Sequence, residues 1–419
     1  MASTSTELTF TLPVPHGAPI GSQPLNVTTA AGQVTIADAV TITAITAAPS
    51  GEDARDVRIG STGTDERPLR SLAKAASLAR AGDTIFLKDG IYDEAHGETF
   101  GAVTNAPFRV TSNVPADVTI KGESVAGTKI MGPGSKSTGV CGLVPAGNVR
   151  IETLDISGFD FGVFLINADG AVKNVSVHAC TTGLRVEKSA TETREIKFTL
   201  DASRVYENTS TGISSSGLPI SVADTEIDHN GAGQAGGGPG IEGAGGATLT
   251  GVNIQDNAGY GYRGVQTPSP DTPLVVTNSS FVNNSLAAIV LLGSSVTGSW
   301  SVKIRDSRFI DNNQVVLVNV PFTQFDLGTE NSHGMNQFTI RWNGEGIVNA
   351  RNATSESLPP IRVFGNTWTI RGDAGSAIPP SGCSNQNSPS TPKPPYHWRI
   401  DQPGTCLSTG KHTGNVIVN

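Results

Sequence analysis

A short pattern of one apolar residue, two mostly polar residues and an asparagine recurs five times in the middle of the chain. Successive asparagines are 22, 27, 27 and 28 residues apart. A small residue followed by an apolar one recurs in the same frame. Repeats of this length cannot each bury an apolar face alone, so they indicate a stacked solenoid. The five phrases are Val205–Asn208, Ile227–Asn230, Ile254–Asn257, Phe281–Asn284 and Phe309–Asn312, and the second pattern comprises Gly212-Ile213, Gly240-Ile241, Gly264-Val265 and Ala288-Ile289.

The residues between the asparagines predict short strands. Ala202–Tyr206 and Thr250–Ile254 alternate polar and apolar side chains and contain β-branched residues, which is typical of strands. Asparagine suits the turns because it tolerates left-handed backbone angles and its amide bonds to nearby backbone. Identical amides stacked at the ~4.8 Å strand spacing are also able to bond to one another as a ladder. The predicted fold is therefore all-β, a right-handed parallel β-helix.

The two ends of the chain differ from the repeats. Residues 1–50 hold alternating stretches broken by Pro and Gly, which predicts a small β extension that ends near residue 50. Residues 68–80 begin with Pro and carry apolar side chains at helical spacing, so we expect a helix that caps the open end of the core. The expected β-helix domain is 51–419, with coils over about 83–372 and 412–419 and a Pro-rich insertion at about 373–411.

Composition and charge narrow the range of functions. The 419 residues include 49 Gly and only 16% charged residues, and the net charge of −8 argues against nucleic acid as a partner. No run of 18 apolar residues is present, so no transmembrane helix is expected. The 3 Met and the many Thr, Asn and Gly favour an exported protein, secreted or held in the cell envelope, without its signal segment. Because no coiled-coil pattern is found, a monomer is expected.

The four cysteines do not have the spacing of a metal cluster. Cys383 and Cys406 bracket the Pro-rich stretch, and a disulfide between them is the leading interpretation, in keeping with export. Cys180 lies one coil before Asn208 in the asparagine column, where it would replace the ladder amide. Whether Cys180 pairs with Cys141, or both are buried free thiols, is left open by the sequence.

Three short motifs precede the repeats: Gly82-Asp83-Thr84-Ile85, Asp89-Gly90-Ile91-Tyr92 and Gly97-Glu98-Thr99-Phe100. With the preceding helix, they resemble the opening of bacterial β-helix proteins in the pectate-lyase-like superfamily. More narrowly, the segment is similar to an uncharacterised family of exported bacterial proteins with a Gly-Glu-Thr-Phe segment. The resemblance implies the β-helix fold. It leaves function open, since the superfamily contains lyases, hydrolases, esterases, epimerases and proteins without known activity.

One of these motifs, Gly90-x-Tyr92-x-Glu94, matches a signature of pectin methylesterases. The other motifs of those enzymes do not occur in the required arrangement. We therefore interpret Gly90 and Tyr92 as turn residues of the first coil. The paired aspartates and the Gly-His-Gly of polygalacturonases are also absent. A calcium-dependent lyase site remains open, because its carboxylates and basic residue would be assembled across coils.

The position before each asparagine is polar in every repeat. It holds Glu207, His229, Asp256, Asn283 and Asp311, which would lie ~4.8 Å apart along the stack. If these side chains point outward, they form an acidic strip, in which Glu207 and Asp256 are candidate calcium ligands through their oxygens. The alternative is a solvated turn, because charged rows are commonly surface features.

The coils in the middle of the stack contain the best candidates for a functional site. Acid, base and aromatic side chains fall on successive coils there, and Tyr faces stack on sugars while Arg pairs with carboxylates. The alternative is a long glycine-rich loop, 231–246, that the tyrosines cover. Candidate catalytic residues are Arg204, Asp228, His229 and Arg263, and candidate substrate-binding residues are Glu207, Glu226, Glu242, Asp256, Tyr260 and Tyr262.

Three hypotheses about function follow. The first is an extracellular or cell-surface protein that engages carbohydrate polymers, because a long rigid face with repeating polar side chains matches a repeating polymer. The second is a polysaccharide lyase or hydrolase that acts on a glycan containing uronic acid, with calcium as the one cofactor suggested. The third is a non-catalytic structural or adhesive protein of the envelope.

Overall fold

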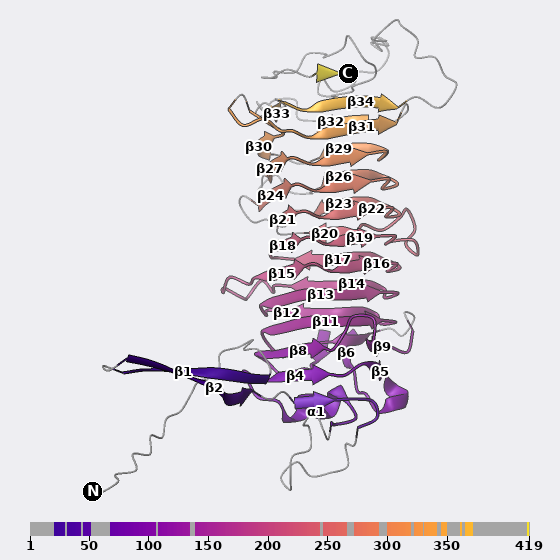
Figure 1. Cartoon of the computed structure of the whole chain (residues 1–419). Coiled ribbons are helices and arrows are strands. Elements are labelled where there is room, and N and C mark those ends of the chain that lie inside the picture. The colour runs from indigo at the N-terminus through magenta and orange to yellow at the C-terminus, as the bar shows by residue number, and fades with distance from the viewer. Residues whose placement is uncertain are drawn as a thin grey trace, which may run out of the picture.

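The chain winds into a right-handed parallel β-helix, shown in Figure 1 as a tall stack of short strands. The computed structural model describes residues 21–29, 32–42, 45–51, 68–105, 108–134, 139–243, 246–265, 272–292, 300–319, 322–329, 331–341, 345–349, 361–362, 365–371 and 417–418.

Each coil contributes one strand to each of three parallel sheets, which we call the first, second and third sheet. The first contains β4 (Thr84–Leu87), β8 (Val118–Gly122), β15 (Phe198–Asp201), β18 (Ile220–Ala223), β21 (Ala247–Thr250), β24 (Thr272–Thr277), β27 (Trp300–Arg305), β30 (Phe322–Asp326) and β33 (Ile361–Arg362). The second contains β5 (Gly90–Tyr92), β9 (Thr128–Met131), β16 (Arg204–Tyr206), β19 (Glu226–Asp228), β22 (Asn253–Gln255), β25 (Ser280–Val282), β28 (Arg308–Ile310), β31 (Gln337–Arg341), β34 (Thr367–Arg371) and β35 (Ile417–Val418).

Two long strands, β11 (Val149–Ser157) and β13 (Gly170–His178), run through both the first and the second sheet. The third sheet contains β10 (Val140–Leu143), β12 (Phe161–Ile166), β14 (Thr182–Glu187), β17 (Thr211–Ser216), β20 (Ile241–Gly243), β23 (Tyr260–Val265), β26 (Ala287–Leu292), β29 (Gln314–Asn319) and β32 (Glu345–Asn349). A hairpin of β6 (Gly101–Asn105) and β7 (Phe108–Thr111) closes its N-terminal edge, because β6 pairs antiparallel with β10.

The N-terminal segment contains an antiparallel ribbon of β1 (Gly21–Thr29) and β2 (Gly32–Ile42). Next comes β3 (Ile45–Ala47), which pairs in parallel with β4. The first sheet therefore begins before residue 50, where the sequence suggested that the extension ends. The division of the chain into an extension and a β-helix domain stays a prediction.

Helix α1 (Leu72–Leu78) lies inside the expected range 68–80 and sits at the end of the stack, as Figure 1 shows. Its Leu72, Ala75 and Ala76 are buried in the main core. A short 3-10 turn, η2 (Glu94–His96), follows β5. The apolar side chains of α1 cover the open end of the core, as expected for a capping helix.

The opening motifs have structural roles. Tyr92 is buried, and its hydroxyl lies 2.8 Å from the carbonyl oxygens of Ala47 and Lys88. Glu98 accepts the backbone N–H groups of Leu72 and Ala73 at 2.7 and 2.9 Å, so it caps α1. Both side chains hold the first coil and the helix together, which agrees with reading Tyr92 as a structural residue and not as part of an esterase site.

The asparagine ladder predicted from the repeats is present. The five asparagines are at most 1% exposed, and the Nδ2 of each of the first four donates to the Oδ1 of the next asparagine along the stack. The four distances are 2.9, 3.0, 2.9 and 2.9 Å, from Asn208 through Asn230, Asn257 and Asn284 to Asn312. The left-handed backbone, however, belongs to the residue before each asparagine, because the five preceding residues have φ between 52° and 55°.

Cys180 continues this column toward the N-terminus, as the sequence suggested. It is fully buried, and its N–H donates to Asn208 Oδ1 at 3.0 Å. Cys180 and Cys141 are both buried free thiols, and burial raises the pKa of each to about 12. Cys383, Cys406 and the Pro-rich insertion lie outside the described residues.

A second ladder, which was not predicted from the sequence, stabilises the turn between the first and second sheets. Hydroxyls of Ser203, Ser279 and Ser307 accept backbone N–H groups from the preceding coil at 3.1 to 3.2 Å. The column then continues with Asn336 and Asn366, whose side chains bond to each other at 2.9 Å. Asn366 therefore belongs to this second column.

Candidate functional site

Three of the predicted catalytic residues meet on the outer face of the second sheet. Arg204 and Asp228 come from adjacent coils, because β16 and β19 pair in parallel. Arg204 Nε and Nη2 donate to Asp228 Oδ1 and Oδ2 at 3.0 and 2.8 Å, a bidentate geometry. His229 Nδ1 lies 2.8 Å from Asp228 Oδ2. Asp228 is thus held between a guanidinium and an imidazole.

The burial of these three side chains differs sharply. The Asp228 side chain is 1% exposed, whereas those of Arg204 and His229 are 47% and 57% exposed. The hydrogen bonds to Asp228 raise the pKa of Arg204 above its usual value. Arg204 therefore remains a fixed cation, and it is better suited to binding than to acting as a base. The His229 side chain is the more exposed of the two.

The cluster continues toward the N-terminus through an aromatic stack. Tyr206 lies between the His178 ring, stacked at 4.6 Å, and the Arg204 guanidinium, 4.2 Å above the ring centre. His178 Nε2 in turn contacts Asp155 Oδ2 at 3.1 Å. This row was not recognised from the sequence. The signal was available, because His178 and Tyr206 stand at the same place in successive repeats.

On the C-terminal side, Glu226 extends the same face. Its Oε2 lies 3.4 Å from Arg204 Nε, and its Oε1 accepts Gln255 Nε2 at 2.9 Å. Side chains from five consecutive coils, on β11, β13, β16, β19 and β22, are therefore joined in one row. We call this row of Asp155, His178, Tyr206, Arg204, Glu226, Asp228, His229 and Gln255 the second-sheet row.

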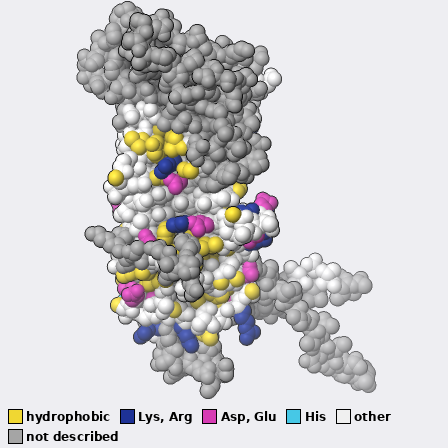
Figure 2. All heavy atoms as spheres, turned by 180° about the vertical axis from the view of Figure 1, so that it is seen from behind, with side chains coloured by type: hydrophobic (Ala, Val, Ile, Leu, Met, Phe, Trp, Pro, Cys, Tyr) yellow, Lys and Arg dark blue, Asp and Glu magenta, His cyan; other side chains and the backbone are white. Residues whose placement is uncertain are grey.

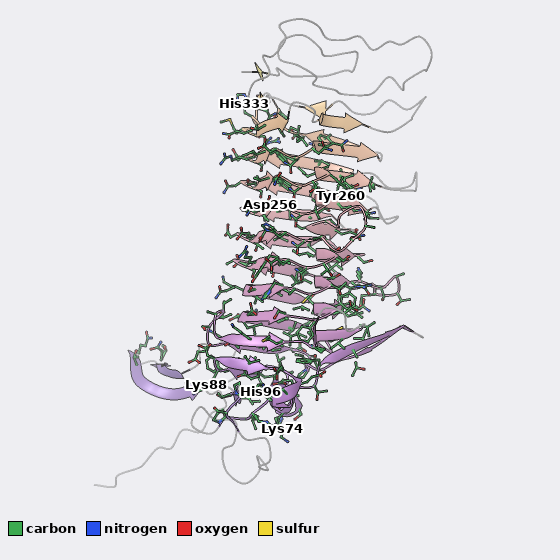
Figure 3. All side chains as sticks on the ribbon, turned by 90° about the vertical axis from the view of Figure 1, so that its right-hand side faces the viewer. Lys74, Lys88, His96, Asp256, Tyr260 and His333 are labelled. Atoms are coloured by element: carbon green, nitrogen blue, oxygen red, sulfur yellow. The ribbon has the colours of Figure 1, made fainter. Side chains whose placement is uncertain are left out.

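The polar column before the asparagines borders the second-sheet row. Glu207, His229 and Asn283 are exposed, and Asp256 and Asp311 are half-buried. Figure 3 shows Asp256 at this turn, on the flank of the stack. Asp256 Oδ1 accepts Asn283 Nδ2 at 2.6 Å, whereas the Glu207 carboxylate has no side-chain partner among the described residues. We call this column the turn column.

The turn column gives the suggested calcium site no support. Glu207 and Asp256 are two coils apart, so ~9.6 Å of stack separates their backbones, with His229 between them. Among the described residues, no group of three or more His, Cys, Asp or Glu side chains is arranged to hold a metal ion. Calcium at these two residues stays a prediction.

The remaining predicted site residues lie on the third sheet, apart from the second-sheet row. Glu242 on β20 and Arg263 on β23 form an ion pair at 3.1 Å. Tyr260, labelled in Figure 3, is half-buried at the start of β23. Arg263 therefore does not join Arg204 and Asp228, because the two groups stand on different sheets.

The prediction that Tyr262 binds substrate is wrong. Its side chain is fully buried in the core, where it pairs in register with Ile241 and Ile289. Desolvation raises the pKa of its hydroxyl above the usual value. The small–apolar pattern in this coil is accordingly Gly261-Tyr262 and not Gly264-Val265. Alignment with the isoleucines of the neighbouring repeats would have identified Tyr262 as a core residue.

Two further surfaces carry polar groups. A depression of about 340 Å³ lies on the first sheet, where Asn148 bonds to Asp117 and to the N–H of Asp169 at 3.0 Å each, beside Arg150 and Lys197. On the third sheet, the Arg185 guanidinium lies 4.8 Å from the centre of the Phe161 ring. The face in Figure 2 is largely uncharged, with a few neighbouring pairs of opposite charge.

Comparison with known proteins supports the fold. Residues 161–320 match the family model described as the right-handed β-helix region. An uncharacterised protein of Bacillus subtilis (strain 168), YwoF, is 32% identical over 85 residues, which make up 20% of this chain and 17% of that protein. The match thus spans less than a fifth of the relative's length.

Several solved structures are similar at low identity. Pectate lyase Pel9A is 13% identical, with a TM-score of 0.35 over 76% of this chain and 80% of that chain. The A-module of the Azotobacter vinelandii mannuronan C-5 epimerase AlgE6 is 15% identical, with a TM-score of 0.40 over 71% and 81%. A GH87 α-1,3-glucanase catalytic domain, in complex with nigerose, is 11% identical, with a TM-score of 0.36 over 72% and 62%. At these scores we base no functional assignment on them.

No helix among the described residues is long and apolar enough to cross a membrane.

Proposed function

We propose that this protein binds a carbohydrate polymer along the outer face of its second sheet. The observation that carries the proposal is the second-sheet row, in which side chains from five consecutive coils form one connected set of donors, acceptors and an aromatic ring. Successive coils repeat at ~4.8 Å, so the face offers hydrogen-bonding side chains of several kinds at regular intervals. A polymer with repeating hydroxyl groups is the ligand that such a face suits.

The row is held in place before any ligand arrives. Asp228 orients both Arg204 and His229, and Tyr206 is fixed between His178 and Arg204. Fixed side chains lose little conformational freedom on binding, which favours affinity on an open surface. Sugar hydroxyls would bond to the exposed parts of Arg204 and His229, because the Tyr206 ring is already covered on both faces.

Export, as a secreted or cell-envelope protein, and a monomeric state belong to this proposal as predictions. Export is in keeping with a rigid solenoid that meets polymers outside the cell. A monomer is sufficient, because one chain already presents the whole second-sheet row.

An enzymatic role is the second candidate function. The observation in its favour is the contact between the His229 imidazole and the buried Asp228 carboxylate at 2.8 Å, since a carboxylate orients a histidine for proton transfer. A lyase that used Arg204 as its base is disfavoured, because the raised pKa of Arg204 keeps it protonated.

Binding of purified full-length protein to a panel of soluble oligosaccharides, measured by isothermal titration calorimetry, tests the proposal. In the variant Tyr206→Ala, the stack between His178 and Arg204 is lost, and we expect affinity to fall about 5- to 30-fold. Lys173→Ala, on the first sheet, is the matched control and should bind normally.

Equal affinity of Tyr206→Ala and the wild type for every bound glycan would contradict the second-sheet site. Ultraviolet absorbance of unsaturated products and assays of reducing ends, on the same glycans, detect lyase and hydrolase activity. Activity that is lost in His229→Ala would favour the enzymatic candidate over binding alone.

A further inference from the structure

The depression of about 340 Å³ on the outer face of the first sheet is separate from the second-sheet row. It lies around Ala171, whose register partners are Arg150 in the preceding coil and Thr199 in the following one. Ala171 has the smallest side chain of the three, so space is left between its two neighbours, whose backbones stand ~9.6 Å apart along the stack. We call this depression the first-sheet hollow.

One wall of the first-sheet hollow is a column of turn residues that hydrogen bonds hold in place. Asn148 donates its Nδ2 to Asp117 Oδ1 and accepts the N–H of Asp169, at 3.0 Å each. Asp169 uses both carboxylate oxygens, because Oδ1 accepts the N–H of Lys197 at 2.8 Å and Oδ2 accepts Arg194 Nη1 at 3.2 Å. The wall is therefore fixed before a ligand arrives, and Arg194 balances the charge of Asp169.

Two cations that line the first-sheet hollow have no such partner. Arg150 and Lys197 are exposed, and among the described residues no ion pair joins either side chain to a carboxylate. The neighbouring column of the sheet holds its charges in ion pairs, Lys121 with Glu152 at 4.0 Å and Lys173 with Asp201 at 2.8 Å. Charge around the hollow is thus close to balance, and its distinctive feature is a set of unused donors, which the exposed Thr199 hydroxyl completes.

The number and charge of these donors indicate the kind of anion that fits. A phosphate monoester carries three strong acceptor oxygens and nearly two negative charges at pH 7, which matches three donor groups and two unpaired cations. A carboxylate has one charge and two oxygens in a plane, and the fork of Arg150 alone would satisfy it. A tetrahedral dianion is therefore favoured over a carboxylate.

We propose that the first-sheet hollow is a second binding site, which takes the phosphate group of a phosphorylated sugar. Arg150 binds the phosphate oxygens from the preceding coil, and Lys197 and Thr199 bind them from the following coil. Hydroxyls of the sugar bond to Asn148 and to Asp117 Oδ2 on the turn wall. The volume is at the lower end for small-molecule sites, which suits one sugar unit and not a polymer.

Isothermal titration calorimetry of the full chain tests the ligand class with four sugars that differ at one carbon: glucose 6-phosphate, glucose 6-sulfate, glucuronate and glucose. We expect glucose 6-phosphate to bind about 10-fold more tightly than the sulfate or glucuronate, and glucose to show no binding. Added salt should weaken the phosphate complex, because the two cations are exposed. Sulfate or glucuronate binding as tightly as the phosphate would overturn the inference, and so would binding of none of the four.

The variant Arg150→Gln/Lys197→Gln should lose about 10- to 30-fold of the affinity for glucose 6-phosphate, because both charge-assisted contacts are removed. The matched control is Lys129→Gln/Arg308→Gln, which removes the same two charges from exposed side chains of the second sheet and should bind within about 2-fold of the wild type. A drop of equal size in the control would show an effect of net charge alone and overturn the inference.

The variant Ala171→Phe tests the first-sheet hollow itself, because it fills the space and leaves every charge in place. We expect binding of glucose 6-phosphate to be lost while the circular dichroism spectrum stays that of the wild type, since residue 171 is on the outer face of its strand. Wild-type affinity in Ala171→Phe would place the phosphate elsewhere. These outcomes are separate from those for glycan binding, because no residue of the second-sheet row lines the hollow.

Discussion

At the scale of single residues, the asparagine of each turn and the residue before it have different structural roles. The asparagine turns inward and satisfies buried backbone groups, whereas the residue before it adopts a left-handed backbone and turns outward. Asn257 makes the point, because its Nδ2 donates to Asn284 Oδ1 and to the Ile227 carbonyl oxygen at 2.9 and 3.1 Å. Its Oδ1 accepts both the N–H and the Nδ2 of Asn230.

Replacing Asn257 with alanine should therefore be strongly destabilising. The substitution leaves buried donors and acceptors in the coils above and below without partners, and we expect it to lower the free energy of unfolding by about 2–4 kcal/mol. The change is measured as a lower urea midpoint by circular dichroism.

The matched control is Glu207→Gly in the first turn of the column. Glu207 is exposed, its carboxylate has no side-chain partner among the described residues, and glycine accepts its φ of 52° without strain, so this variant should unfold near the wild-type midpoint. Equal destabilisation by the two substitutions would refute the division of roles between the two positions.

Residue patterns in the sequence were sufficient for the fold and only partly sufficient for the site. The asparagine spacing predicted the ladder because each amide bonds to its counterpart one repeat away. Tyr262 was misplaced because the glycine-rich stretch around it hides which residue is in register with Ile241. Arg263 was grouped with Arg204 because the repeat period gives the coil of a residue and not the sheet on which it lies.

At the scale of elements, the N-terminal helix depends on a residue distant in sequence. Glu98 accepts two N–H groups at the start of α1, while Ser71 Oγ accepts that of Lys74 at 3.1 Å. The sequence identified the Gly-Glu-Thr-Phe segment as part of a family resemblance. Its physical role is to cap α1. That role follows from hydrogen bonds to Leu72 and Ala73, which lie 26 and 25 positions earlier in the chain, so a local sequence pattern does not reveal it.

Glu98→Ala should weaken the closure at this end of the stack. Two N–H groups at the start of the helix lose their acceptor, and we expect a local loss of about 1–2 kcal/mol. Hydrogen exchange read by mass spectrometry should show faster exchange in α1 and the adjoining β3 and β4, and unchanged exchange in β22 and β25.

Glu94→Ala in η2 is the control, because Glu94 is exposed and its backbone contact to Gly97 does not involve the side chain. Slow exchange in α1 in the Glu98→Ala variant, equal to that of the wild type, would argue against the capping role.

At the scale of the whole molecule, the coils from β13 to β29 contact their immediate neighbours through parallel pairing in all three sheets. Stability of such a stack is close to a sum over coils and their interfaces. Removing a complete coil should therefore leave a folded protein, because the flanking coils present matching surfaces to each other.

Deletion of Thr209–Asn230 tests this expectation. It removes one full repeat of 22 residues and joins Asn208 to Gly231, so that the ladder continues with Asn257. We expect a β-rich, monodisperse protein that resists limited proteolysis. The deletion also removes Glu226, Asp228 and His229, so glycan binding should be lost while the fold is retained.

Deletion of Thr209–Ile220, about half a repeat, is the control and should give an unfolded or aggregated chain, since the remaining strands no longer meet their counterparts. Loss of structure in the full-repeat deletion, to the same degree as in the control, would contradict the additive view of the stack.

The direction of the hydrogen bonds between coils has a mechanical consequence. In every sheet these bonds connect one coil to the next, so they run along the stack axis. A pulling force along that axis loads the bonds at every interface between coils, and a terminal coil yields first because it has a neighbour on one side only. The chain would peel from an end in discrete steps, each of which frees one repeat of 22 to 28 residues, or roughly 75–95 Å of extended chain. Such a protein lengthens one repeat at a time while the remaining coils stay folded.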